Sequence, residues 1–148
     1  MLFRSQSKLR PAIVLADAGR QDWILCQVTS KPYGDTRAIP LNDSGFESGS
    51  LRLESYMRPG KLFTAHQTLI VSEAGLLKEV TFNRIIDAKG VHLFESIEIE
   101  SARRALVLIL DEPMAAMNEA ALLSEDSLAQ DWNRSEEDAA WSHLQPGK

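Results

Sequence analysis

Short apolar runs separated by turn residues fill the first half of the chain. From residue 51 to residue 58, apolar and polar positions alternate, which is the pattern of a strand with one buried face, and Pro59 and Gly60 are expected to end it. Short strands in such a series, without long helices between them, predict a mostly β small barrel or sandwich. The other apolar runs lie at residues 11–16, 23–29, 37–41, 61–65 and 68–72.

The spacing of apolar residues changes between residues 76 and 88. There they recur at near-helical intervals with charged residues between them, which predicts an amphipathic helix that ends at Lys89 and Gly90. Residues 91–100 contain an alternation typical of a strand. Residues 101–110 fit either a strand or a buried helix, because periodicity does not separate the two.

The last part of the chain favours short helices. Residues 114–130 are rich in Ala and Leu and favour a helix, within which Ser124 could begin a second one. Residues 131–134 are expected to break this helix. Ser135 is then suited to cap a further short helix, whose first turn is acidic, as the helix dipole favours.

The charge of the chain is unevenly placed. Of the 148 residues, positions 1–112 carry 14 basic and 14 acidic residues, whereas positions 113–148 carry 2 basic and 7 acidic ones, which accounts for the net charge of −5. An acidic end can simply stay solvated, or it can dock on a basic surface. Trp132 and Trp141 lie among the acids Glu136, Glu137 and Asp138, and such aromatic anchors favour docking into pockets.

Composition narrows the classes of protein further. With 44% apolar residues, the chain can bury the core of one domain. No apolar run approaches the length of about 20 residues that a membrane span needs, and the first ten residues do not resemble a signal peptide. Cys26 is the single cysteine, which excludes an internal disulfide framework. These features predict a cytoplasmic protein, and no metal or cofactor motif is visible.

Three segments carry a resemblance to a known family. Residues 8–15 (KLRPAIVL), 23–32 (WILCQVTSKP) and 53–64 (LESYMRPGKLFT) resemble, in order and spacing, the PemK/MazF family of bacterial toxins, which cleave mRNA as endoribonucleases. The resemblance covers roughly residues 8–88. It implies a Src-homology-3-like β-barrel with a final helix at residues 76–88, a homodimer, single-stranded RNA as substrate and no cofactor.

The acidic end carries a second resemblance. Residues 123–141 are similar to the acidic, Trp-containing C-terminal segment of antitoxins, which covers the RNA groove of such toxins. This implies a toxin-like barrel at residues 1–90 and an antitoxin-like part at residues 91–148, made of a connection (91–113) and an acidic tail (114–148). Trp132, Trp141, Glu136, Glu137 and Asp138 are the expected docking residues.

The family resemblance also implies site residues. RNA cleavage by the neighbouring 2′-hydroxyl needs proton transfer and groups that stabilise charge on the phosphate. Arg10 would stabilise that charge, Thr29 would hydrogen-bond phosphate oxygens, and Arg58 matches a catalytic Arg of some members, although the Asp that follows it there is absent here. His66 is more typical of a structural residue than of a general base. The expected RNA-binding residues are Ser30, Lys31 and Arg37.

One strand of the family pattern is not matched. Members have an additional strand before the Arg-Pro step, whereas nine residues precede Arg10 here. We expect residues 92–100 or 104–110 to pair with the strand at residues 11–16 instead, because an open barrel edge invites aggregation. Two alternatives stay open: a non-catalytic dimeric interaction module, and a regulator that reaches DNA only through a toxin–antitoxin complex.

Overall fold

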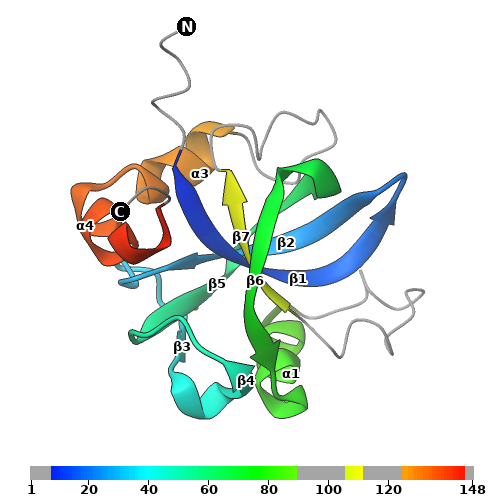
Figure 1. Cartoon of the computed structure of the whole chain (residues 1–148). Helices are drawn as coiled ribbons and strands as arrows, with labels where there is room; N and C mark the ends of the chain where they lie inside the picture. Colours follow the sequence, from blue (N-terminus) through cyan, green and yellow to red (C-terminus); the bar gives the residue numbers. More distant parts are fainter. Residues whose placement is uncertain (1–7, 90–105, 112–124, 146–148) are drawn as a thin grey trace, which may run out of the picture.

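The computed structural model describes residues 8–89, 106–111 and 125–145, and within them the protein is mostly β. Strands of this part form one seven-stranded antiparallel sheet in the order β3-β5-β2-β1-β7-β6-β4 (Figure 1). The strands are β1 (Leu9–Gly19), β2 (Asp22–Thr29), β3 (Ile39–Leu41), β4 (Phe46–Gly49), β5 (Ser55–His66), β6 (Ile70–Leu77) and β7 (Leu106–Asp111). The helices are α1 (Glu79–Lys89), α3 (Glu125–Trp132) and α4 (Ser135–Ala140), with single turns η2 (Asp43–Gly45), η3 (Gln67–Leu69) and η6 (Ser142–Leu144).

The predicted end of a strand at Pro59 and Gly60 is wrong, because β5 continues through both residues. The pairing with β2 explains how. Cys26 of β2 pairs with Leu62 and the next residue, Gln27, pairs with Arg58, so residues 59–61 form a bulge. A bulge is one of the few places in a sheet where proline is tolerated, since it lacks the N–H that a ladder needs.

The helix predicted from residue 76 begins later, at Glu79. Leu76 and Leu77 belong instead to β6, where Leu77 pairs with Phe46 of β4, a strand that the sequence pattern did not indicate. The helix ends at Lys89, as expected, and buries Phe82 and Ile85 in the core. The near-helical spacing of apolar residues thus began within β6, and periodicity alone does not show where the strand ends and the helix begins.

The open question about residues 101–110 is settled as a strand for residues 106–110, the part of this stretch that the structure describes. Leu106–Asp111 forms β7, which pairs with β1 from Leu9↔Asp111 to Ile13↔Val107 and with β6 on its other side. The expectation that this segment covers the edge of the first strand is confirmed, whereas residues 92–100 lie outside the described part. The boundary expected at residue 90 therefore does not mark the end of the sheet, which includes a strand from the later part of the chain (Figure 1).

The C-terminal segment, residues 125–145, packs on both faces of the sheet. Ala12 and Ile13 are neighbours on β1, so their side chains point to opposite faces, and each belongs to a different core cluster. Trp132 joins the cluster of Ala12, and Trp141 joins that of Ile13. Both indoles are fully buried. The segment therefore reaches around the sheet near the start of β1 (Figure 1).

Two details of this segment differ from the prediction. The break falls after Trp132 rather than at residue 131, since α3 includes Asp131 and Trp132. Arg134, not Ser135, occupies the N-cap of α4, and no side chain caps this helix. The acidic first turn of Glu136, Glu137 and Asp138 is confirmed, while Ser124 lies outside the described residues. In the described segments, no helix has the length and hydropathy required to cross a bilayer.

Candidate functional site

Arg10, Thr29 and Arg58 lie on three neighbouring strands, β1, β2 and β5. The Arg58 Nη1 donates a hydrogen bond of 3.1 Å to Thr29 Oγ1, and Thr29 Oγ1 donates one of 2.7 Å to the carbonyl of Lys31. All three side chains are buried, with exposures of 1%, 0% and 3%. Two of these side chains, Arg10 and Arg58, are contacted by the C-terminal segment.

The guanidinium of Arg10 is held by that segment. Its Nε donates to the Trp132 carbonyl at 3.0 Å, its Nη1 donates to the Leu9 carbonyl at 3.3 Å, and its Nη2 donates to Asp138 Oδ1. Lys8 Nζ also lies 3.0 Å from the same oxygen. Burial by itself raises the pKa of the Asp138 carboxyl, but hydrogen bonds from Lys8 and Arg10 outweigh it and hold the pKa below its ordinary value.

Arg58 binds two carboxylates at once. Its Nε donates to Asp35 Oδ2 at 2.9 Å, and its Nη2 lies 2.9 Å from Asp131 Oδ2. Asp131 belongs to α3 and also accepts from Arg134 Nε at 3.1 Å. Burial alone raises the pKa of Asp35, yet the bonds from Arg58 and from the Arg37 N–H lower it overall. A carboxylate therefore does adjoin Arg58, although the loop after β2, rather than the residues following Arg58, supplies it.

Among the acids of the segment whose burial the structure describes, Glu137 is the most completely buried. Its side chain is 0% exposed and accepts from the Ser30 N–H at 2.9 and 3.0 Å, from Ser30 Oγ at 2.7 Å and from Tyr33 Oη at 2.6 Å. Trp141 Nε1 adds a further bond of 2.6 Å. These donors are all neutral groups. Burial, together with the bond to and the charge of Glu137, raises the pKa of the Tyr33 phenol well above its ordinary value.

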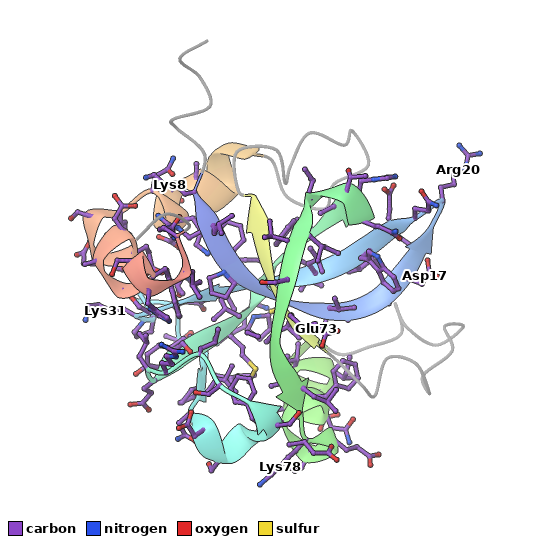
Figure 2. The ribbon with its side chains drawn as sticks, in the orientation of Figure 1. Lys8, Asp17, Arg20, Lys31, Glu73 and Lys78 are labelled. Atoms are coloured by element: carbon purple, nitrogen blue, oxygen red, sulfur yellow. The ribbon has the colours of Figure 1, made fainter. Side chains whose placement is uncertain are left out.

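Of the residues predicted to bind RNA, one contacts the C-terminal segment and two are exposed. Ser30 takes part through two of its groups, whereas Lys31 and Arg37 are exposed. Figure 2 shows Lys8 and Lys31 on the side of the molecule where α3 and α4 lie. The Arg37 guanidinium passes so close to Gly60 that a β-carbon there would come within 2.3 Å of it. Glu136, the neighbour of Glu137, points into solvent.

The two Trp residues and His66 have defined roles in the structure. Trp132 Nε1 donates to the Val28 carbonyl at 2.8 Å, and its ring meets Phe63 edge-on at a centroid distance of 5.6 Å. His66 Nδ1 accepts from the Thr68 N–H at 3.2 Å and caps η3. Among the described residues, no group of His, Cys, Asp and Glu is arranged to hold a metal ion.

Sequence reasoning did not single out Tyr33, Asp35 or Asp131. Tyr33 and Asp35 lie in a turn cluster, where such residues are common for local reasons. Asp131 lies in a stretch expected only to break a helix. No local pattern marks these three residues, because each owes its place in the site to a partner distant in the sequence.

Comparison of the chain with protein-family models, with curated proteins and with solved structures found no match.

Proposed function

We propose that the chain is an endoribonuclease of the PemK/MazF type whose RNA groove is covered by its own C-terminal segment. One observation carries the proposal. Three carboxylates of that segment form ion pairs or hydrogen bonds with the groups expected to bind RNA phosphates, namely two arginines and the donors of one serine. Asp138 binds Arg10, Asp131 binds Arg58 and Glu137 binds the donors of Ser30.

Carboxylates are suited to replace phosphates at such a surface. Both are anions with oxygens that accept paired hydrogen bonds from guanidinium and hydroxyl groups. In the uncovered site, Arg10 and Arg58 would stabilise negative charge on the cleaved phosphate, and Thr29 would position one of its oxygens. Thr29 lies within hydrogen-bonding distance of Arg58, which supports a shared role.

The proposed fold is a curled barrel of the Src-homology-3 type. The two outermost strands of the sheet, β3 and β4, follow each other in the sequence with residues 42–45 between them. Leu41 at the end of β3 and Phe46 at the start of β4 pack in the same core cluster. Both features favour a sheet that bends until its two outer strands meet. We further propose that the barrel forms a homodimer.

Covalent linkage makes the segment an effective inhibitor. A tethered group has an effective concentration in the millimolar range, far above that of most RNA sites in solution. Residues 1–112 are neutral overall, so RNA has no strong general attraction to displace the segment. The chain would therefore be inactive until the segment is displaced.

The experiment compares RNA cleavage by the intact chain and by an opened chain, defined as the full chain with Asp131→Asn, Glu137→Gln and Asp138→Asn. Cleavage of a labelled single-stranded RNA should rise at least about tenfold, because these changes remove the charged contacts of the segment. Glu136→Gln is the matched control, since Glu136 is exposed in the same turn, and it should leave cleavage unchanged. A folded opened chain that does not cleave RNA contradicts the proposal.

A second set of variants assigns the activity to the site. In the opened chain, Arg10→Lys, Arg58→Lys and Thr29→Val should each reduce cleavage by about 10²-fold or more, the usual loss when one stabilising donor is removed. Circular dichroism checks that each variant is folded. Cleavage that survives all three changes would point to a contaminating nuclease.

A non-catalytic interaction module is the second candidate, and one observation favours it. Trp132 and Trp141 are fully buried in the two core clusters, as structural residues would be. A permanent position would show as slow hydrogen exchange of both indole N–H groups, matched to global unfolding, whereas displacement during activation requires faster exchange. The exchange rates of these two groups therefore discriminate between the two functions.

A further inference from the structure

The turn after β2 presents three hydrogen-bond donors to one point. The Ser30 N–H, Ser30 Oγ and Tyr33 Oη all donate to the carboxylate of Glu137 at 2.6 to 3.0 Å. The turn itself is closed by a hydrogen bond of 3.0 Å from the Asp35 N–H to the Pro32 carbonyl. Two hydroxyls and a backbone amide form an arrangement that suits an anion with several acceptor oxygens, such as a phosphate.

The ring of Tyr33 is covered by a second group of the same segment. The guanidinium carbon of Arg134 lies 4.0 Å from the ring centroid, and Asp131 holds this side chain from the other end at 3.1 Å. A guanidinium is a flat, delocalised group that stacks on aromatic faces. The face of Tyr33 is therefore open to a flat partner once the segment is displaced.

We infer that Ser30 and Tyr33 form a nucleotide subsite of the RNA groove. The Ser30 N–H, Ser30 Oγ and Tyr33 Oη bind one phosphate where Glu137 now lies, and the Tyr33 ring stacks the adjoining base where Arg134 now lies. This inference rests on the proposed function and adds to it a residue, Tyr33, that binds both chemical parts of one nucleotide. The C-terminal segment then imitates a nucleotide with an anion and a planar cation.

The chemistry of Tyr33 fits this assignment. A phenol has an ordinary pKa of about 10, so Tyr33 Oη is protonated at neutral pH and can donate to an anion. Stacking of a base on an aromatic ring tolerates any base, because each has a π-face. The subsite therefore contributes affinity for single-stranded RNA without demanding one base at this position.

The test measures binding of an uncleavable RNA to the opened chain. The probe is a fluorescein-labelled single-stranded heptamer with 2′-O-methyl groups, and the readout is fluorescence anisotropy. In the opened chain, Tyr33→Phe should weaken binding about tenfold through loss of the hydroxyl bond. Tyr33→Leu should weaken it several-fold more through loss of stacking. Ser30→Ala should weaken binding about fivefold, and Ser44→Ala, an exposed serine in η2, should leave it unchanged.

The possible outcomes distinguish a failure of the proposed subsite from a failure of the proposed endoribonuclease function. If RNA binds the opened chain and Tyr33→Leu and Tyr33→Phe both stay within about twofold of it, the subsite is refuted while the proposed function stands. Binding that depends on Tyr33 without any cleavage supports the subsite and contradicts the endoribonuclease. A folded opened chain that binds no RNA overturns both. Circular dichroism of each variant shows whether it is folded.

Discussion

Replacing Glu137 tests the docking of the C-terminal segment most directly. Its carboxylate is fully buried and accepts hydrogen bonds from four donor groups: the amide and hydroxyl of Ser30, the hydroxyl of Tyr33 and the indole of Trp141. Glu137→Ala removes the shared acceptor of all four. It also leaves the Trp141 Nε1, on a fully buried side chain, without its acceptor.

The expected loss is large compared with an ordinary surface change. A hydrogen bond to a charged group contributes about 1.5–3 kcal/mol, but four bonds to one carboxylate are not additive, and the cost of burying that carboxylate offsets part of their sum. A buried neutral donor left without its acceptor costs about 1–3 kcal/mol, and Glu137→Ala does this to more than one donor, so we expect a loss of about 3 kcal/mol. That is a large fraction of the 5–15 kcal/mol by which most domains are stable.

Urea unfolding followed by tryptophan fluorescence measures this loss, since Trp132 and Trp141 are buried and their emission shifts when unfolding exposes them to solvent. The matched control is Glu136→Ala in the same helical turn, where an exposed acid interacts mainly with the helix dipole and should cost less than about 1 kcal/mol. The proposed docking of Glu137 is refuted if the free energies of unfolding of the two variants differ by less than about 1 kcal/mol.

Three further predictions follow from the same contacts. Because the pKa of Asp138 is lower in the folded chain than in the unfolded chain, its charge stabilises the fold above the unfolded pKa, and this stability is lost as the pH falls through the folded pKa. Asp138→Asn should therefore reduce the dependence of the free energy of unfolding on pH at acid pH, measured by urea unfolding at a series of pH values. An unchanged dependence would contradict the ion pairs of Asp138 with Lys8 and Arg10. Trp132→Phe should cost about 1 kcal/mol through the lost bond to the Val28 carbonyl, and Trp132→Ala about 3–5 kcal/mol by calorimetry; equal losses would show that the ring is not packed as described. Absorbance titration should show Tyr33 ionising above the ordinary pKa of about 10, and Glu137→Gln should lower that pKa because it removes a negative charge.

Local pattern determined several parts of this protein by itself. The runs at residues 11–16, 23–29 and 37–41 became β1, β2 and β3, because each is bounded by turn residues that end a strand for local steric reasons. The acidic first turn of α4 follows in the same way from the preference of a helix start for anions. Such features depend on residues only a few positions apart, and the sequence displays them directly.

Other parts were decided by contacts between distant segments. Residues 106–111 are a strand because β1 and β6 offer them free edges on both sides, and β5 passes Pro59 because β2 shifts register beside it. The candidate site depends most strongly on such contacts. Family resemblance indicated Arg10 and Arg58. It did not indicate that Asp138 binds Arg10 or that Asp131 binds Arg58.

Glu136 and Glu137 show the difference most clearly. They are the same residue type, adjacent in one helical turn, and the sequence offers no local reason to separate them. In the structure, Glu136 faces solvent, whereas Glu137 is fully buried against Ser30, 107 residues away. Successive helical residues point about 100° apart, so the angle at which α4 docks on the sheet selects which acid is buried. The sequence determined that an acidic helix exists, and only the tertiary structure decided that Glu137 and Asp138, but not Glu136, bind the site.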